Sequence, residues 1–225
     1  MNFPVLALDA AVGKSYGCLI LSDTETLFAE SEGSRGHSQT LVPMLEGLLK
    51  KADLEWQDLN ILALGIGPGS FTGLRIAAAA LAGINASLQL PVLSVSSLAI
   101  TSVQADSEEP LYVLEDARAG EVFVGRYCAG APVQADHCIS WDEFSSVEPC
   151  SYTSVTTPPV DLSGWQRLEP ALHRGEAMAM LVREAMEREV REGALSNLPI
   201  YVQPAYLQIS QAERTLRARE QKFDG

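Results

Sequence analysis

The chain has 225 residues, 47% of them hydrophobic and 20% charged, so it can bury the core of one large domain or two small ones. Its formal net charge of −13 excludes the broad basic surface with which a protein binds nucleic acid unaided. The four cysteines lack Cys-x-x-Cys spacing, so we expect reduced thiols. Neither a signal-peptide pattern nor an apolar run of roughly 18 residues is present, so we expect a cytoplasmic protein without a membrane span.

Three short apolar segments open the chain and predict a β-meander. Strands are expected over Val5–Asp9, Tyr16–Leu21 and Thr26–Glu30, and their short connections favour antiparallel pairing. Asp9 ends the first strand, where some ATPases place a metal-phosphate site, but the Ala-Ala-Val-Gly at 10–13 lacks the hydroxyl groups that would hold phosphate. We interpret Asp9 as a strand-end cap, and a relic of a metal-phosphate site is the alternative.

A loop from Gly33 and a helix from about Ser38 to Ala52 follow. The helix places leucines along one side, and further apolar residues make this side broader than an amphipathic helix requires. The leucines are Leu41, Leu45, Leu48 and Leu49. His37 opens the helix, but a leucine stands four residues later where a second metal-binding His would fall. We therefore expect His37 to be a loop or capping residue and no metal ligand.

The central segment reads as a strand, a glycine-rich turn and a helix. An apolar run at 60–64 ends in the turn 65–70, and the segment 71–88 is rich in Ala, the best helix former. Ser70 or Thr72 can cap the helix. Small residues along the helix would let another helix approach closely, and these are Gly73, Ala77, Ala80 and Gly83.

The chain does not match three nucleotide-binding or catalytic motifs that its glycines suggest. A dinucleotide fingerprint would need its third glycine one place before Gly73. The Gly-Lys-Ser at 13–15 is no phosphate-binding loop, because Leu8 occupies the position of the first glycine. Pro68 likewise stands where a nucleophile elbow around Ser70 needs glycine.

The second half begins after a strand at 92–95 and a helix that starts at Ser96–Ser97. A polar, acidic break at 104–110 marks the expected boundary between an N-terminal lobe, 1–104, and a smaller C-terminal lobe, 105–225. Strands at 111–114 and 121–127 flank a turn in which Asp116 and Arg118 are interpreted as a stabilising pair, with a catalytic role as the alternative.

A charged amphipathic helix is expected at 176–192, and the last segment of this lobe can pack back on the first. Its inward residues are Met178, Leu181, Val182, Ala185 and Met186. The tail beyond Ser210 is charged and predicted to be loosely held or disordered.

Taken together, these residues resemble the bacterial TsaB (YeaZ) family, the partner subunit in the synthesis of threonylcarbamoyladenosine on tRNA. The strongest match is the turn motif Gly67-Pro68-Gly69-Ser70-Phe71-Thr72-Gly73-Leu74-Arg75-Ile76. Further matches are Arg35 to Gln39, Val95 to Leu98, Asp116 to Arg118 with Gly120 to Val122, and Pro204 to Leu207. The chain departs from the family pattern at Ala10-Ala11, Ala77 and Gln208, where the family has Thr-Ser, Gly and Arg.

The resemblance implies an actin-like, ribonuclease H-like two-lobed α/β fold without a working active site: no catalytic, cofactor-binding or metal-binding residues. It implies a non-catalytic subunit that forms a heterodimer with TsaD, is joined by the ATPase TsaE, and meets tRNA only through the complex. ATP, ADP and metal are then expected on the partner subunits. The rival functions are a glycoprotease-like metallopeptidase, which needs a metal-ligand cluster, and a stand-alone actin-fold ATPase, which needs intact phosphate turns.

The partner surface is expected on the two helices of the first lobe, lying side by side. The predicted interface residues are the four leucines above and Gly73, Ile76, Ala77, Ala80 and Gly83. Without TsaD, the same surface is expected to form a homodimer, because exposed apolar patches mark association sites.

Overall fold

The first lobe is a five-stranded mixed sheet covered on both faces. The structure, a computed structural model, describes residues 2–31, 37–200 and 202. The strands of this sheet are β1 (Val5–Asp9), β2 (Tyr16–Ile20), β3 (Thr26–Glu30), β4 (Ile61–Gly65) and β5 (Val92–Val95), in the order β3-β2-β1-β4-β5. The pairs β1–β2 and β2–β3 are antiparallel, which confirms the predicted meander, and β1, β4 and β5 are parallel.

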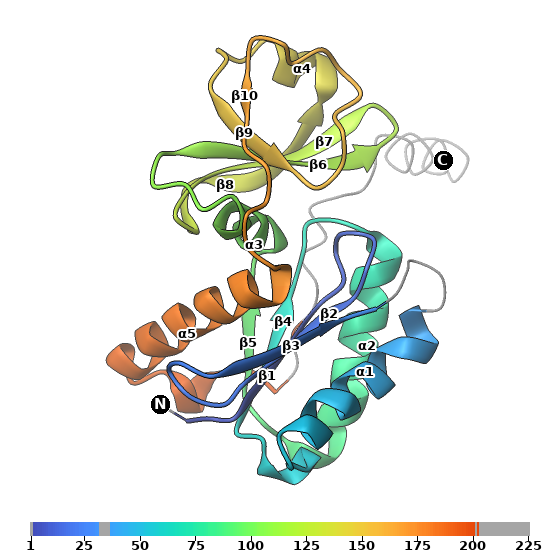
Figure 1. Ribbon diagram of the computed structural model, residues 1–225, viewed down its shortest axis with the longest axis vertical. Coiled ribbons are helices and arrows are strands. Elements are labelled where there is room, and N and C mark those ends of the chain that lie inside the picture. Colours follow the sequence, from blue (N-terminus) through green and yellow to red (C-terminus); the bar gives the residue numbers. More distant parts are fainter. Residues whose placement is uncertain (1, 32–36, 201, 203–225) are drawn as a thin grey trace, which may run out of the picture.

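Three long helices sandwich this sheet. Helices α1 (His37–Lys51) and α2 (Phe71–Leu88) lie side by side on one face, and α5 (Arg174–Glu192) covers the other (Figure 1). A short 3-10 helix, η1 (Trp56–Asp58), precedes β4. The five inward residues predicted for α5 are all buried, and the helix begins two residues earlier than predicted, where the His173 side chain caps it. The chain therefore returns to the first sheet after it has built the second.

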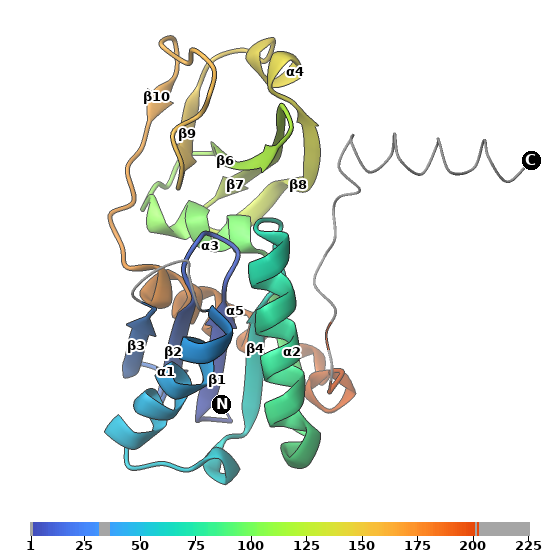
Figure 2. The same cartoon turned by 90° about the vertical axis from the view of Figure 1, so that its right-hand side faces the viewer.

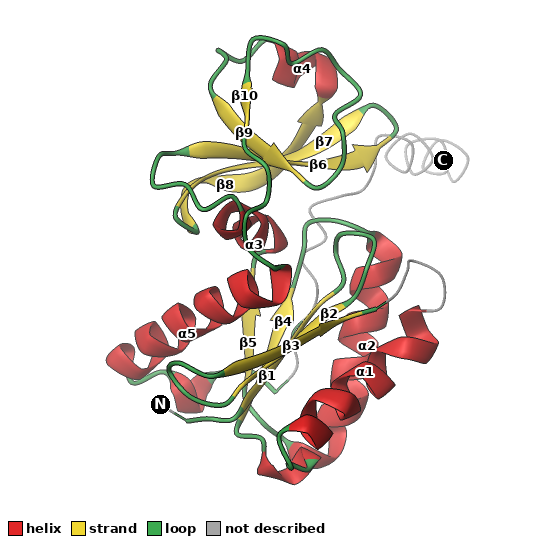
Figure 3. Cartoon of the chain, in the orientation of Figure 1, coloured by secondary structure: helices red, strands yellow, loops and turns green. Residues whose placement is uncertain are grey.

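The second lobe is another five-stranded sheet, and a helix lies between the two sheets. Its strands are β6 (Leu111–Arg118), β7 (Glu121–Cys128), β8 (Ala131–Ser140), β9 (Ser151–Ser154) and β10 (Gln166–Arg167), in the order β10-β9-β6-β7-β8. Helix α4 (Trp141–Ser145) packs on its outer side, and η2 (Leu195–Asn197) follows α5. Helix α3 (Ser97–Gln104) separates the sheets (Figure 2). The two-lobed α/β architecture expected from the sequence is thus present (Figure 3).

The hydrophobic core follows this division. One cluster fills the space between the first sheet and α1–α2, and a second joins the opposite face of that sheet to α3, α5 and the second sheet. Aromatic side chains dominate a third cluster beneath α4, where the rings of Phe144 and Trp165 stack 4.9 Å apart. Because α3 and α5 contribute to the same cluster, they form the packed junction of the lobes.

Helix α2 corrects the expectation that no apolar segment reaches roughly 18 residues: among the described residues it alone meets the length and hydropathy expected of a membrane-crossing helix. One third of that span is buried inside the fold, against β4 and α1. Its apolar character therefore has a local structural role, since the inner side of α2 supplies part of the first core cluster.

Candidate functional site

The glycine-rich turn between β4 and α2 packs against the turn that follows β1. The Ser70 N–H donates to the carbonyl oxygen of Ala11 at 2.7 Å, and the Ser70 hydroxyl caps α2 by accepting from the Gly73 N–H at 3.3 Å. On its other side the turn is tied to α3, because the Gly67 N–H donates to the Ser97 hydroxyl at 3.0 Å. The N-terminus of α2 therefore closes over residues 10–11, the place where a phosphate-binding turn would receive its ligand.

Two glycines of this motif are required by the close approach. Gly69 has a φ of +154°, and a Cβ there would lie 2.5 Å from the Ala11 carbonyl oxygen. A Cβ on Gly73 would overlap the carbonyl oxygen of Ala10. Glycine is thus needed at both positions because two backbone segments approach each other closely there. This requirement favours a structural role for the motif over nucleotide binding.

Replacing Gly73 by Ala is expected to destabilise the fold by about 1–3 kcal/mol, because overpacking outweighs the gain in helix propensity. Gly83→Ala is the matched control: it lies on the same helix, a Cβ there meets no atom within 4 Å, and stability should rise by up to about 1 kcal/mol. Urea unfolding of both variants measures the difference. Equal stabilities would contradict this account of the motif.

The end of β1 holds a buried ion pair. Arg174 Nε donates to Asp9 Oδ2 at 2.8 Å, and the Ser97 hydroxyl donates to Asp9 Oδ1 at 2.6 Å. The rest of the guanidinium donates to the Thr101 hydroxyl at 2.9 Å, the Gln104 side-chain oxygen at 3.0 Å and the Ser97 carbonyl oxygen at 3.0 Å. Asp9 is fully buried and Arg174 nearly so.

This network replaces the interpretation of Asp9 as a strand-end cap. Both carboxylate oxygens are held by groups of the chain itself, and the cation beside Asp9 is a guanidinium. Sequence reasoning missed Arg174 because 165 positions separate it from Asp9 and no local pattern joins them. One signal was available in the sequence for a buried arginine. Arg174 is the first residue of an amphipathic helix and lies on the side that faces the sheet.

A second buried carboxyl, Glu115 on β6, lies close to this network. Its Oε2 has no hydrogen-bond partner among the described residues. Burial raises the pKa of Glu115 from 4.5 to about 7, against the opposing effect of the Arg174 charge. At neutral pH Glu115 therefore holds its proton much more often than an exposed glutamate does.

Glu115 should make the fold less stable as pH rises from 4.5 to about 7. A carboxyl with a raised pKa binds its proton more tightly in the folded state, so its contribution is greatest below pH 4.5 and is lost through pH 7. We expect the stability of Glu115→Gln, relative to the native chain, to increase by about 2–3 kcal/mol between pH 5 and pH 8. Urea unfolding of both proteins over this pH range is the measurement. A stability difference between them that does not change with pH would contradict the raised pKa of Glu115.

The other polar candidates have local roles or cannot be placed. Arg118 pairs with Asp116 at 3.3 Å and donates its backbone N–H to the same carboxylate at 3.0 Å, which confirms a turn-stabilising pair. His37 begins α1, but its side chain and residues 32–36 lie outside the described part, as do Pro204 to Leu207 and the tail. Within the described residues, no three His, Cys, Asp or Glu side chains gather into a metal-binding group.

The predicted interface requires a correction. The four leucines of α1, Leu41, Leu45, Leu48 and Leu49, are at most 3% exposed and pack in the first core cluster. Gly73 and Ala77 of α2 are buried as well. The breadth of the apolar side of α1 has a simple reason: the helix must cover β2 and β3 and also contact α2. These six residues cannot present a surface to a partner.

What remains accessible on α2 is a narrow strip. Of the predicted interface residues, Gly83 is exposed, and Ile76 and Ala80 are half-buried. The exposed residues at helical spacing, here called the α2 outer strip, are Phe71, Arg75, Ala79, Gly83 and Ala86. At one end the Arg75 guanidinium lies 3.7 Å from the centre of the Phe71 ring, which is 48% exposed.

Comparison with known proteins supports one family. The family profile described as "TsaD: tRNA N6-adenosine threonylcarbamoyltransferase" matches residues 30–139. The chain is 30% identical over 155 residues to the tRNA threonylcarbamoyladenosine biosynthesis protein TsaB of Haemophilus influenzae, covering 67% of this chain and 65% of the relative. It is 35% identical over 96 residues to TsaB of Escherichia coli, covering 41% and 42%.

A solved structure extends the likeness to the whole fold. YeaZ from Pseudomonas aeruginosa superposes with a TM-score of 0.67 at 27% identity, covering 88% of this chain and 99% of that one. Against the curated sequences, the chain spans less than two thirds of its relatives' length, 61% for TsaB of Buchnera aphidicola and 65% for that of H. influenzae. The sequence likeness is thus partial, while the structural likeness covers both lobes.

Proposed function

Because this chain belongs to the TsaB (YeaZ) family, we propose that it acts in the biosynthesis of tRNA threonylcarbamoyladenosine as a non-catalytic subunit that binds TsaD. The observation that carries the proposal is the closed end of β1. Asp9 is bound on both oxygens by Arg174 and Ser97, and the turn after it is packed beneath the N-terminus of α2.

In this proposal the chemistry belongs to the partner. An actin-like ATPase needs an accessible carboxylate and phosphate-binding groups at the first turn, and here those positions serve internal packing. Nucleotide and metal are therefore assigned to TsaD and TsaE, and the isolated chain is assigned neither peptidase nor ATPase activity.

The match to the TsaD family suggests how the two subunits pair. The matched region, 30–139, contains α1, α2 and the strands β4 and β5 of the first sheet, so TsaD is expected to carry related helices. Small side chains on the α2 outer strip permit close approach of a second helix, and the exposed Phe71 ring adds apolar area at one end. We assign the strip to TsaD binding, and to self-association of this chain when TsaD is absent.

We expect the isolated chain to bind tRNA weakly at physiological salt. Affinity for nucleic acid depends mainly on Lys and Arg contacts to phosphate, and this chain has 16 Lys and Arg against 29 Asp and Glu. Filter binding over a salt series is the measurement. Tight, strongly salt-dependent binding by the chain alone would contradict the assignment of tRNA contacts to the complex.

Co-purification with the TsaD protein of the same organism tests the proposed function. A tagged copy of this chain should retain TsaD in a stoichiometric complex through gel filtration, and TsaE should join when ATP is present. Separate elution of correctly folded chain and TsaD would overturn the proposal.

A further inference from the structure

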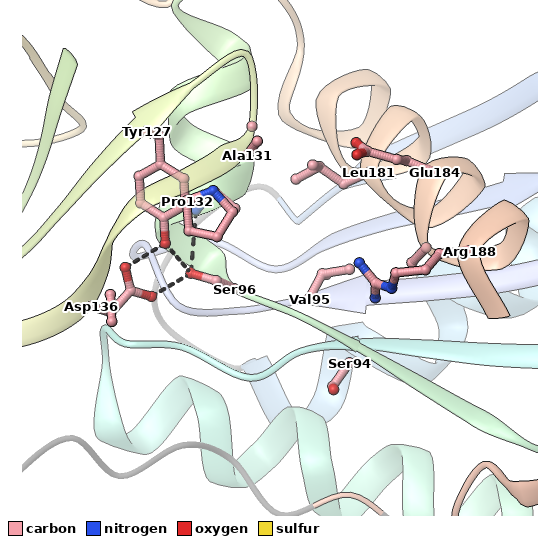
Figure 4. Close-up of a pocket in the computed structure, with 14 residues that line it drawn as sticks. Ser94, Val95, Ser96, Tyr127, Ala131, Pro132, Asp136, Leu181, Glu184 and Arg188 are labelled. Atoms are coloured by element: carbon pink, nitrogen blue, oxygen red, sulfur yellow. Dashed lines mark hydrogen bonds between the residues drawn. The ribbon is translucent and has the colours of Figure 1, made fainter. Parts of the chain in front are cut away.

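A cavity of about 530 Å³ lies at the lobe junction, between α5, the β5–α3 connection and the β7–β8 hairpin. Its floor is apolar, formed by Val95, Ala99, Pro132, Leu181 and Ala185. Figure 4 shows polar groups on two of its sides, one from the second sheet and one from α5. A concave apolar site with a few convergent polar groups is typical of small-molecule binding.

The first polar side is built from Ser96, Tyr127 and Asp136. The Ser96 hydroxyl donates to Asp136 Oδ2 at 2.6 Å, and the Tyr127 hydroxyl donates to Asp136 Oδ1. Ser96 also caps α3 by accepting from the Leu98 and Ala99 N–H groups, so its hydrogen-bonding capacity is used.

This side of the cavity can therefore accept hydrogen bonds from a ligand, but it has no free donor to offer one. With both hydroxyl protons directed to the carboxylate, the remaining capacity consists of lone pairs on Asp136 and Tyr127. Burial raises the pKa of Asp136, and the hydrogen bonds from Ser96 and Tyr127 oppose this by favouring the negatively charged carboxylate. An ammonium group satisfies both properties, since it has only donors and a positive charge.

The second side is cationic. Arg188 extends from α5 into the cavity, and Figure 4 shows its guanidinium directed toward β5, across from the Ser96–Tyr127–Asp136 group. Its contact with Glu189 is at 3.8 Å, the outer limit of an ion pair. Glu184, one turn earlier, is exposed at the rim. Arg188 thus offers donors that suit a carboxylate.

We propose that this cavity binds a small zwitterion of the amino-acid or short-peptide class, with its ammonium group at Asp136 and Tyr127 and its carboxylate at Arg188. The apolar floor receives the aliphatic part of the ligand. The proposal does not depend on pairing with TsaD, because it rests on residues of the lobe junction alone.

Calorimetric titration of the full chain with free L-amino acids, dipeptides and tripeptides tests the inference. At least one compound should bind, and whether amino acids or peptides bind best identifies the source of the shared chemistry. N-acetylation of that compound should weaken binding at least about tenfold, and so should C-terminal amidation, because each removes one charged hydrogen-bonding group.

Variants locate the site. Arg188→Gln should weaken binding at least about tenfold, as should Asp136→Asn, whereas Arg191→Gln, exposed on the same helix outside the cavity, should leave binding unchanged. If Asp136→Asn fails to fold, Arg188→Gln and the N-acetylated and C-amidated ligands decide, because the Arg188 side chain is 56% exposed and its replacement should not disturb folding. Lack of binding by every compound at millimolar concentration overturns the proposal, and so does binding that Arg188→Gln leaves unaltered.

Discussion

Arg174→Met is expected to lower the free energy of unfolding by about 3–5 kcal/mol. Removing one partner of a buried ion pair leaves the other charge without compensation. The variant would leave the Asp9 carboxylate buried with the hydrogen bond from Ser97, and the side-chain oxygens of Thr101 and Gln104 would lose the donor that Arg174 supplies. Asp9→Asn should cost a similar amount for the opposite reason, because the arginine then loses its counter-charge.

Urea unfolding of the two single variants and the double variant measures this pair. Because the single changes each leave an unpaired group, the double variant should be less destabilised than the sum of the two. Arg191→Met, an exposed arginine on the same helix, is the control and should stay within about 0.5 kcal/mol of the native chain. Additive losses, or a loss at Arg174 no larger than at Arg191, would show that the network does not hold the end of β1.

Gly83→Arg is expected to abolish binding to TsaD while the chain stays folded. Gly83 is exposed between Ala79 and Ala86 on the α2 outer strip, so a long charged side chain there would keep the partner helix away. Folding should not suffer, because arginine favours helix more than glycine does. The few residues that dominate an interface lie near its centre and can each account for about 2 kcal/mol or more, so we expect at least about a 30-fold loss of affinity.

Affinity for TsaD is compared among three variants. Gln134→Arg introduces the same side chain on an exposed position of β8 and should bind as the native chain does. Gly83→Ala should be intermediate, because a methyl group only slightly widens the helix contact. Full binding by Gly83→Arg would place the TsaD surface elsewhere on the molecule, and equal loss in Gln134→Arg would indicate a general charge effect.

The order of elements could be predicted closely because periodicity and turn residues act locally. The strand Val5–Asp9, the helix Phe71–Leu88 and the inward side of α5 are all where the pattern indicated. The long strand β8 was not anticipated, since its first half is exposed on the sheet edge and shows no alternation of apolar residues.

The site was harder to predict because it depends on contacts that are distant in sequence. Apolar spacing identified the leucines of α1 but could not say which neighbour covers them, and β2, β3 and α2 together do so. The motif glycines were recognised, yet their reason, the carbonyl groups of Ala10 and Ala11, lies some 60 positions away. The partner of Asp9 is farther still, on α5.

Reconstitution of the modification with purified components shows whether TsaD needs this chain as a partner. Unmodified tRNA, the threonylcarbamoyl adenylate donor, TsaD and TsaE are incubated with or without this chain, and threonylcarbamoyladenosine is measured by mass spectrometry of the digested tRNA. We expect product with the native chain and with Gln134→Arg, and background levels without the chain or with Gly83→Arg. Product formed equally well in the absence of the chain, or by the chain in the absence of TsaD, would contradict its role as a non-catalytic partner.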